Sequence, residues 1–552
     1  MIKENFAVDI EHYSISGAPV FTVAQARQIE AQFGADRGQF PLMQAAALAI
    51  VHKMQQEFGA DLKNKKWVVV TGNGNNGGDG YEIATNLIAL GCSNIAVLSV
   101  QPPKMGLCAN EARSRYLEAH GLLYALFLKN DSASKAEAEL DINPLCIQVI
   151  KSADYVVDAI VGIGIGSDFD VTRASAQKTM AAVNLVNEAS QAKVLAVDIP
   201  SLLNAQTGDA AAHYVIKADY TFSVFGLRPG LLFGAAANYC GRVIAVYPDI
   251  GSMAKILQTM FQAQPCLAFD YKGVQQALPM RQATDHKGTA GRVLLVGGNV
   301  GMHGALMLSS LGALRTGAGL ITACFADAQG QMPLNMLAPE VMTIKPTADK
   351  LPATLIKSDA VVLGPGLGRD EVGAKLFATI WTQIQDTTLL VIDADGLWHL
   401  RQMFNQPQND ELALKRKLIL TPHVGEAAML LNKSITEVLA NPLEAAQQIA
   451  KLYSAVCVLK SNRTVVASFD KTQVFVGVVG SPAMASGGMG DLLSGITAAL
   501  GTQVKDPMVT AVMAVAIHGR AGELAGEQEG IMGTCARDLL PYVRLLRNKR
   551  ER

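Results

Sequence analysis

Short apolar runs alternate with amphipathic or glycine-rich stretches along most of the chain, and these runs fall into two groups. The runs of the first group have the length of buried strands and lie at residues 67–71, 95–100, 155–160, 194–197, 220–225 and 243–246. Those of the second group lie at residues 292–297, 360–363, 389–392, 418–420 and 456–459. Strands that alternate with helices form largely parallel sheets covered by those helices. The pattern therefore predicts two α/β units.

The segment between the two groups is different. Residues 248–285 carry no strong strand pattern and include Pro265 and Pro279. We expect the boundary near residues 250–265, with one domain at 1–255 and the other at 256–552. The residues before Phe21 are expected to form an N-terminal arm. No repeat of 20–50 residues is visible, which excludes solenoids and propellers.

Composition narrows the class of protein. The chain has 552 residues, of which 50% are hydrophobic and 17% charged, and its mean hydropathy is +0.22. Because an average protein has about 25% charged residues, this chain is unusually apolar, which excludes a disordered protein. The longest candidate for a membrane span, residues 304–314, is much shorter than the ~20 residues that cross a bilayer. We expect a globular protein with no membrane segment.

Charge and cysteine content give three further expectations. The net charge is −1 and no long basic run occurs, so the footprint of a nucleic-acid-binding protein is missing. The first residues lack the basic and apolar regions of a signal peptide, and the eight cysteines include no C-x-x-C pair. We therefore expect reduced thiols in a cytoplasmic protein, without a disulfide framework or a zinc site. The high apolar content also favours a homo-oligomer.

A glycine-rich stretch follows the first strand. Gly72–Gly80 reads GNGNNGGDG, and we expect it to be a loop that leads into a helix at about residues 81–90. Glycines let the backbone approach a ligand, and a helix N-terminus favours anionic groups. The spacing does not match the G-x-G-x-x-G dinucleotide fingerprint. A solvent-exposed turn is the alternative, but five glycines with three asparagines and one aspartate favour a ligand-binding loop.

Two more loops of the first unit follow strands. DAIVGIGIG occupies residues 158–166, and VDIPS occupies residues 197–201. Ligands of open α/β sheets bind beyond the carboxyl ends of the strands, so these loops are expected to converge with the glycine-rich one. Asn76, Asp158 and Ser201 offer hard oxygen ligands that suit a cation such as K⁺.

NNGGDG, DAIVGIGIG and VDIPS, in this order, resemble the epimerase domain of bifunctional NAD(P)H-hydrate repair enzymes. The resemblance implies a Rossmann-like three-layer domain that interconverts the R and S forms of NADHX and NADPHX, nicotinamides hydrated at ring carbon 6. It places K⁺ on Asn76, Asp158 and Ser201 and makes Asp198 catalytic. The family usually has glycine after the serine of IPS, where this chain has Leu202. The implied substrate-binding residues are Asn75, Asn76, Gly77, Gly78, Asp79, Gly162, Ile163, Gly164, Ile165, Gly166, Ser167, Asp168 and Asp198.

The loops of the second unit carry their own motifs. They read GNVGMHGA (298–305), GPGLG (364–368), DADGL (393–397), LTPHVGE (420–426), LKSNRTVV (459–466) and SGGMGD (486–491). Asp491 immediately precedes a helical stretch, where consecutive backbone amides can stabilise phosphate charge. A carboxylate at such a position is suited to take a proton from a substrate hydroxyl.

This set resembles the ADP-dependent NAD(P)H-hydrate dehydratases, which share the ribokinase-like α/β fold. The resemblance implies that Asp491 deprotonates the hydroxyl at carbon 6, which then attacks the terminal phosphate of ADP, so that AMP and phosphate are released with NAD(P)H. ADP is a co-substrate and is expected to bind with Mg²⁺. Ala305, Gly366, His423 and Asp491 would bind the hydrated substrate. The implied nucleotide-binding residues are Lys460, Ser461, Asn462, Arg463, Thr464 and Gly490.

Purely structural roles remain possible interpretations of single residues, and other functions remain possible for the whole chain. His423 alone is typical of a helix cap at Glu426, and His518 lies on an apolar stretch typical of a satisfied core histidine. One alternative function is an ATP-dependent vitamin or sugar kinase with an accessory nucleotide-binding domain. The other is a non-catalytic nucleotide-sensing scaffold, against which stand the retained Asp79, Asp158, Asp198 and Asp491.

Overall fold

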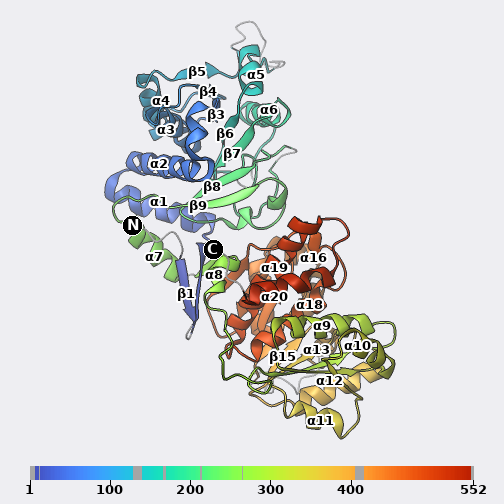
Figure 1. The fold of residues 1–552 in the computed structure, drawn as a ribbon. Coiled ribbons are helices and arrows are strands. Elements are labelled where there is room, and N and C mark those ends of the chain that lie inside the picture. The colour runs from blue at the N-terminus through green and yellow to red at the C-terminus, as the bar shows by residue number, and fades with distance from the viewer. Residues whose placement is uncertain are drawn as a thin grey trace. The chain divides into compact units, whose positions relative to one another are not determined.

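The computed structural model describes residues 6–10, 13–128, 140–165, 169–189, 191–211, 214–263, 265–404 and 416–548. The chain forms two compact units, drawn in Figure 1. One unit consists of residues 18–264, and the other of residues 5–17 and 265–552. Residues 5–17 thus belong to the second unit, although the sequence boundary placed them with the first.

The first unit is built on a seven-stranded sheet in which every pair of neighbours is parallel. Its order is β5-β4-β3-β6-β7-β8-β9. The strands are β3 (Trp67–Thr71), β4 (Ile95–Ser99), β5 (Leu122–Ala125), β6 (Tyr155–Ala159), β7 (Lys193–Val197), β8 (Tyr220–Val224) and β9 (Arg242–Val246).

Helices cover both faces of this sheet. The helices of the unit are α1 (Val23–Arg37), α2 (Gln39–Phe58), α3 (Asn75–Ala89), α4 (Cys108–Glu118), α5 (Pro144–Lys151), α6 (Ala174–Ala189) and α7 (Met253–Ala263). Val68 and Val70 pack in one cluster with Ile150 of α5 and Val183 of α6. Side chains alternate along a strand, so Val69 faces the other side, towards α3. In Figure 1, α3 and α4 lie on one side of the sheet and α5 and α6 on the other.

The second unit is built on a twelve-stranded mixed sheet of order β1-β2-β10-β19-β18-β17-β16-β15-β14-β11-β12-β13. The strands from β17 through β13 in this order run parallel, whereas β18 is antiparallel to both of its neighbours. The strands are β1 (Phe6–Ile10), β2 (Tyr13–Pro19), β10 (Cys266–Phe269), β11 (Arg292–Gly297), β12 (Leu320–Phe325), β13 (Met342–Ile344), β14 (Ala360–Leu363), β15 (Leu389–Ile392), β16 (Leu418–Leu420), β17 (Val456–Leu459), β18 (Val465–Ser468) and β19 (Val474–Gly477).

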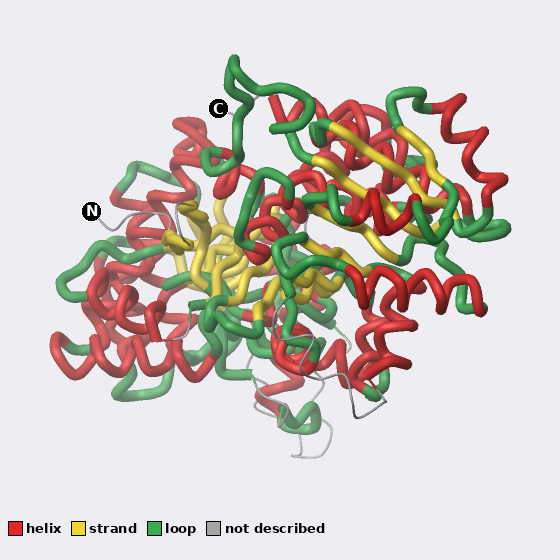
Figure 2. Tube along the Cα trace, turned by 90° about the horizontal axis from the view of Figure 1, so that it is seen from below, coloured by secondary structure: helices red, strands yellow, loops and turns green. Residues whose placement is uncertain are grey.

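Helices also flank the strands of this unit, as the red and yellow tubes of Figure 2 show. The helix α18 packs closely on α9, and Oγ of Ser309 lies 3.0 Å from Oγ of Ser494 between them. The helices are α8 (Tyr271–Gln275), α9 (His303–Thr316), α10 (Gln331–Leu337), α11 (Lys350–Leu355), α12 (Glu371–Gln383), α13 (Asp395–Phe404), α15 (Val424–Leu431), α16 (Ile435–Ala440), α17 (Pro442–Leu452), α18 (Met489–Gly501), α19 (Pro507–Glu529) and α20 (Leu540–Asn548).

The predicted α/β class is confirmed, and so are most of the strands. Five apolar runs of the second group coincide with β11, β14, β15, β16 and β17, and the first group agrees to within one residue. The expectation of no strand in residues 248–285 is wrong, because β10 lies there and pairs with β19. The N-terminal arm is an antiparallel hairpin, β1–β2, that extends the second sheet. No described helix is both long and apolar enough to cross a membrane.

Candidate active sites

A cavity of about 400 Å³ opens in the first unit, beyond the carboxyl ends of β3, β6, β7 and β8. The loops after these strands all contribute to its wall, as the three convergent motifs predict. Asn75, Asn76, Asp79, Gly162, Ile163, Gly164 and Asp198 line it. Of the other predicted residues, Ile165 lies in the hydrophobic core, and Gly166, Ser167 and Asp168 lie outside the described residues.

The glycine-rich stretch is helical from Asn75 onward, so the expected loop up to Gly80 is wrong. Its glycines are needed for packing. A Cβ on Gly77 would lie 2.1 Å from the carbonyl oxygen of Gly72, and one on Gly78 would lie 2.7 Å from Sδ of Met43. These glycines bring the first turn of α3 against the sheet and against α2. The N–H groups of that turn then face the cavity, where they favour an anionic ligand.

Three carboxyl groups and one fully buried guanidinium surround the cavity. Oδ1 of Asp198 lies 3.6 Å from Nη2 of Arg228. Burial raises the pKa of Asp79 well above its usual range, and the neighbouring Asp198 and Glu30 raise it further. Burial also raises the pKa of Glu30, with a contribution from Asp198. The cavity therefore holds carboxyl groups in different environments, the arrangement that acid–base chemistry requires.

Sequence reasoning missed three charged residues of this cavity. Arg27 and Glu30 come from α1, a helix that no motif marks, and they line the cavity one helical turn apart. Arg228 follows the carboxyl end of β8, and its Nη2 donates a 2.8 Å hydrogen bond to the carbonyl oxygen of Val224. The rule applied to the other loops, that polar residues after parallel strands converge, would have found Arg228 but not the other two.

The predicted cation ligands come together beneath this cavity. Asp158 is completely buried, and its Oδ1 accepts a 2.6 Å hydrogen bond from Oγ of Ser201. The side-chain oxygen of Asn76 lies beside Gly162, while its Nδ2 is buried without a hydrogen-bond partner among the described residues. Burial raises the pKa of Asp158 to about 6. A buried carboxylate with neutral oxygen donors around it and no cationic partner in the described part of the chain fits a monovalent cation.

The turn after β7 has an unusual backbone. Asp198 has φ +64° and Leu202 has φ +71°, both in the left-handed region. Non-glycine residues seldom adopt it, and such strain clusters at functional sites. Leu202 stands where the resembled family has glycine, the residue that adopts this conformation without strain. Its fully buried side chain packs in the core cluster of α5 and α6, and this burial compensates for the strain.

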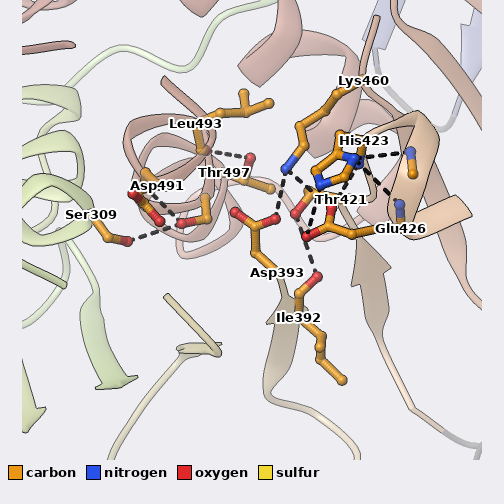
Figure 3. A network of polar contacts seen from close by, with 12 residues as sticks. Ser309, Ile392, Asp393, Thr421, His423, Glu426, Lys460, Asp491, Leu493 and Thr497 are labelled. Atoms are coloured by element: carbon orange, nitrogen blue, oxygen red, sulfur yellow. Dashed lines mark hydrogen bonds and ion pairs between the residues drawn. The ribbon is translucent and has the colours of Figure 1, made fainter. Parts of the chain in front are cut away.

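In the second unit, the charged side chains of Asp393, Glu426 and Lys460 meet beyond the carboxyl ends of β15, β16 and β17 (Figure 3). Nζ of Lys460 donates a 2.7 Å hydrogen bond to Oδ1 of Asp393, which is 1% exposed. The same Nζ lies 4.0 Å from Oε2 of Glu426. Burial opposes the charge of Lys460, but the two carboxylates outweigh it, so the pKa of its ammonium lies above its usual value.

Asp491 lies in the first turn of α18, as the sequence predicts. The helix begins after Gly488, whose φ of +89° is left-handed. Burial, and next the negative charge of Asp393, raise the pKa of Asp491 to about 7. A carboxyl group that ionises near neutral pH is suited to act as a general base.

The structure also brings the other predicted residues of this unit into two groups. A Cβ on Gly490 would lie 3.0 Å from Nζ of Lys460, so the first turn of α18 and the end of β17 are adjacent. Gly366 has φ +60°, and a Cβ there would lie 3.3 Å from Cβ of Ala305 on α9. Lys460 is followed by a turn of residues 461–464, in which Oγ of Ser461 donates a 2.7 Å hydrogen bond to the carbonyl oxygen of Arg463.

The two histidines weighed in the sequence have different environments. His423 caps α15, since its Nδ1 accepts hydrogen bonds from the backbone N–H groups of Gly425 and Glu426. Its ring is otherwise exposed and lies beside Glu426, so capping and substrate contact are compatible. His518 is a buried core residue, as expected, and its ring makes a hydrogen bond with the backbone of Met489. Its Nε2 has no hydrogen-bond partner among the described residues, so the ring is only partly satisfied. Burial lowers the pKa of His518 to about 4.

Asp393 and Glu426 were missed as site residues although both lie in motifs quoted from the sequence, DADGL and TPHVGE. Asp393 directly follows β15, and Glu426 lies a few residues after the end of β16. The signal that identifies Asp158 and Asp198, an acidic residue beyond a buried strand, applies to both.

Two family models match the chain. The family described as YjeF-related protein N-terminus matches residues 39–230, and the family described as NAD(P)H-hydrate dehydratase matches residues 293–544. The bifunctional NAD(P)H-hydrate repair enzyme of Moorella thermoacetica is 34% identical over 525 residues, which cover 92% of this chain and 93% of that protein. The enzyme of the same name from Vibrio cholerae is 34% identical over 532 residues, 96% of this chain and 98% of that protein.

Two solved structures each match about half of the chain. A ribokinase-like superfamily protein from Enterococcus faecalis has a TM-score of 0.47 and 26% identity and covers 51% of this chain and 95% of its own. The ADP/ATP-dependent NAD(P)H-hydrate dehydratase of Bacillus subtilis, co-crystallised with ATP and Mg²⁺, has a TM-score of 0.44 and 28% identity. It covers 50% of this chain and 95% of its own.

Proposed function

The chain belongs to the bifunctional NAD(P)H-hydrate repair enzymes, and we propose that its first unit carries the epimerase and its second unit the dehydratase. The pair of activities returns both epimers of a hydrated nicotinamide cofactor to NAD(P)H, because the epimerase converts the R form into the S form that the dehydratase consumes. The observation that carries the assignment of the second site is Asp491, a carboxyl group with a pKa near 7 at the start of α18, beside Lys460.

The dehydratase must remove the hydroxyl at carbon 6, and hydroxide is a poor leaving group. Asp491 takes the proton of the hydroxyl at carbon 6, and that oxygen forms a bond to the terminal phosphorus of ADP while the bond to the bridging oxygen breaks and AMP leaves. The lone pair of the ring nitrogen then expels phosphate from carbon 6. Loss of a proton from carbon 5 restores the dihydronicotinamide. The protein's contribution is positioning and charge stabilisation, as in other phosphoryl transfers.

We assign the nucleotide to the loop after β17 and to the first turn of α18. Lys460, with the turn of residues 461–464 and Gly490, would hold the phosphates and the adenosine, since an ammonium and helix N-terminal amides both bind phosphate. The carboxylates of Asp393 and Glu426 face the ammonium of Lys460. They are hard oxygen donors that would be available to Mg²⁺ once that ammonium binds the phosphates. Bound Mg²⁺ would neutralise phosphate charge. Ala305, Gly366 and His423 would contact the hydrated nicotinamide.

The epimerase must invert carbon 6. Protonation of the hydroxyl lets the bond from carbon 6 to oxygen break, so that water leaves and the lone pair of the ring nitrogen forms an iminium. Water then adds to the opposite face of carbon 6 and loses a proton. We assign the two proton transfers to the carboxyl pair of the first cavity. Asp79, with its raised pKa, would donate a proton to the substrate, and Asp198, in contact with Arg228, would accept one. The first turn of α3 and Gly162–Gly164 would hold the rest of the substrate.

A K⁺ ion bound by Asn76, Asp158 and Ser201 is part of the proposal. It would neutralise the buried charge of Asp158 and stabilise the loop after β6, in which Val161 N–H donates a 3.0 Å hydrogen bond to Oγ of Ser201. This loop continues into Gly162–Gly164 of the cavity wall. The cation would therefore act by ordering the substrate-binding loop.

We further propose a homo-oligomer in the cytoplasm. Met332, Met336 and Met342 of α10 and the edge strand β13 expose their side chains, which suits burial against a second copy. The eight cysteines form no disulfide within the described part of the chain, which suits a reducing compartment. Light scattering of the purified protein tests the first point.

One assay tests the whole assignment. Purified protein is mixed with an R/S mixture of NADHX and with ADP, and the return of NADH absorbance is followed. Complete recovery is expected. Recovery of the S fraction alone would remove the epimerase, and accumulation of a stable phosphorylated product would replace the dehydratase by a kinase.

A further inference from the structure

A second cavity, of about 710 Å³, lies in the unit of Asp491 but at the other edge of the sheet. Its wall comes from residues 279–290, which precede β11, from residues 314–319, which precede β12, and from residues 544–548 of α20. These segments lie at the amino ends of parallel strands, whereas Asp393 and Lys460 follow carboxyl ends. The cavity therefore shares no wall with the dehydratase site.

The wall of this cavity is strongly cationic. Arg281, Lys287, Arg315, Arg544 and Arg547 line it, against the carboxylates of Asp285 and Glu340 alone. None of the five cations forms an ion pair within 4.0 Å among the described residues. Five positive groups around one hollow repel each other, and clefts of one sign concentrate ions of the opposite sign.

Asp285 does not act as a counter-ion to these groups. Its Oδ2 accepts a 2.8 Å hydrogen bond from the backbone N–H of Gln282, and its Oδ1 lies 3.3 Å from the hydroxyl of Thr289. Both oxygens thus stabilise a local turn. The five cations still exceed the two carboxylates of the wall, so the cavity keeps a net positive charge.

Arg547 is held rigidly at the cavity. Its Nε donates to the carbonyl oxygen of Thr316, and its Nη2 donates to the carbonyl oxygen of Pro279 and to Oε1 of Gln503. Its Nη1 is buried without a partner in the described structure. Burial lowers the pKa of Arg547, and the nearby charge of Arg281 lowers it further. A bound anion would relieve both effects.

Capping of the C-terminus of α9 explains the positions of only some of the five cations around the cavity. Arg547 and Arg281 donate to the carbonyl oxygens of Thr316 and Gly317 at the C-terminus of α9, where cations are favourable. Lys287, Arg315 and Arg544 make no such contact, and the side chains of all three are exposed. Capping therefore orients two guanidiniums, and Arg315 lies in the last turn of α9, where a cation is favourable. It does not account for Lys287 and Arg544.

We propose that this cavity binds a small phosphorylated molecule carrying at least two phosphate groups, at a site separate from both active sites. Guanidinium groups match phosphate oxygens in pairs, and the cations come from three segments that surround a volume typical of small-molecule sites. The apolar side chains of Met280 and Leu314 in the wall would contact the organic part of the ligand.

The test uses inorganic pyrophosphate as the probe, titrated into the full-length protein by isothermal calorimetry. The double variant Arg315→Gln/Arg544→Gln removes two exposed charges of the wall, and we expect it to weaken binding at least tenfold. The matched control Lys375→Gln/Lys451→Gln removes two exposed charges outside the cavity, and we expect it to change affinity by less than twofold. Orthophosphate should bind at least tenfold more weakly than pyrophosphate.

Lys460→Met separates this site from the dehydratase site. Pyrophosphate binding should persist in Lys460→Met, and the Arg315→Gln/Arg544→Gln protein should keep the dehydratase rate of the wild type, which also reports that it folds. Loss of pyrophosphate binding in Lys460→Met, equal losses in the cavity variant and its control, or no binding to the wild type would each overturn the proposal. None of these results bears on the assignment of the two activities.

Discussion

Nζ of Lys460 lies 2.7 Å from Oδ1 of Asp393, and this ion pair acts on the carboxyl group of Asp491 with opposite signs (Figure 3). The charge of Asp393 raises the pKa of Asp491, while the charge of Lys460 lowers it. Burial of Asp491 is the largest contribution. The pair therefore sets the pH range in which Asp491 can accept a proton.

This relationship predicts the pH profile of dehydration. Only the ionised form of Asp491 accepts the hydroxyl proton, so kcat/KM for NADHX at saturating ADP should rise with pH through a midpoint of about 7 and level off above it. Lys460→Met removes a charge that lowers this pKa, so its midpoint should move to higher pH. Asp393→Asn removes a charge that raises the pKa, so its midpoint should move to lower pH. Identical midpoints in all three proteins would disprove the relationship.

The two sites should be separable by single substitutions. Asp491→Asn removes the proposed base, and we expect NADH recovery to fall about 10²–10⁴-fold while exchange between the R and S forms continues. Asp198→Asn should have the converse effect, with dehydration of the S form retained. Chromatographic separation of the two epimers over time measures exchange, and absorbance measures recovery. If either variant lost both activities while still folded, the two-site assignment would fail.

The proposed cation site gives a prediction about K⁺. Replacing KCl by choline chloride at constant ionic strength should slow R/S exchange and lower the temperature at which the first unit unfolds. Asp158→Asn should be slow and insensitive to KCl. Because the pKa of Asp158 is about 6 without the cation, protons should compete with K⁺ below that pH, and the KCl concentration for half-activation should rise there. An exchange rate independent of KCl in the wild type would rule the site out.

Substitutions at Leu202 compare the cost of backbone strain with the stabilisation that comes from burying the side chain. Leu202→Ala keeps the left-handed φ and loses a fully buried side chain, which costs about 2–5 kcal/mol of unfolding free energy. Leu202→Gly loses the same side chain but relieves the strain, which is worth about 1 kcal/mol. Both variants should be destabilised in urea titrations, the glycine variant less than the alanine variant. The reverse order would show that strain at this turn is negligible.

Gly366 should be intolerant of a side chain for reasons that Gly301 does not share. Both have left-handed φ, but a Cβ on Gly366 would lie 2.5 Å from the carbonyl oxygen of Met302, and one on Gly301 would meet nothing within 4 Å. Gly366→Ala should therefore displace the loop beside Ala305 and lower kcat/KM for NADHX at least tenfold. Gly301→Ala, the matched control, should lose about 1 kcal/mol of stability with kcat/KM unchanged within threefold. Equal kinetic effects would place the cause in backbone strain alone.

The fold was predictable where burial is continuous along the chain. The runs at β11, β14, β15, β16 and β17 are apolar at every position except Arg292, the first residue of β11, because both faces of these strands are covered. The ends of such runs are clear in the sequence. The hairpin β1–β2 has no such signal. Its first strand alternates buried and exposed residues, and most residues of its second strand are only partly buried. Its place in the second sheet depends on a partner, β10, that lies about 250 residues away.

The residues of the candidate sites also fall into two classes: those that a local motif marks and those that only tertiary packing brings to the site. Asp491, Asp198, Asp158 and Lys460 each follow a strand or begin a helix within a recognisable motif, so local sequence marks them. Arg27 and Glu30 lie on an ordinary helix, and they reach the first cavity only because α1 packs against that unit's loops. The early start of α3 was also missed, because five glycines indicate a loop unless the neighbours that they pack against are known.

By itself the sequence determined two α/β units and the strands of the two groups of apolar runs, and it predicted the motif residues of both sites, because strand burial and loop chemistry depend on residues that are consecutive in the chain. Only the tertiary structure decided that the N-terminal hairpin joins the second sheet, that Asp393 and Lys460 pair beside Asp491, and that five cations surround a second cavity. Those features depend on contacts between residues far apart in the chain, and electrostatic energies change steeply with the distances that such contacts set.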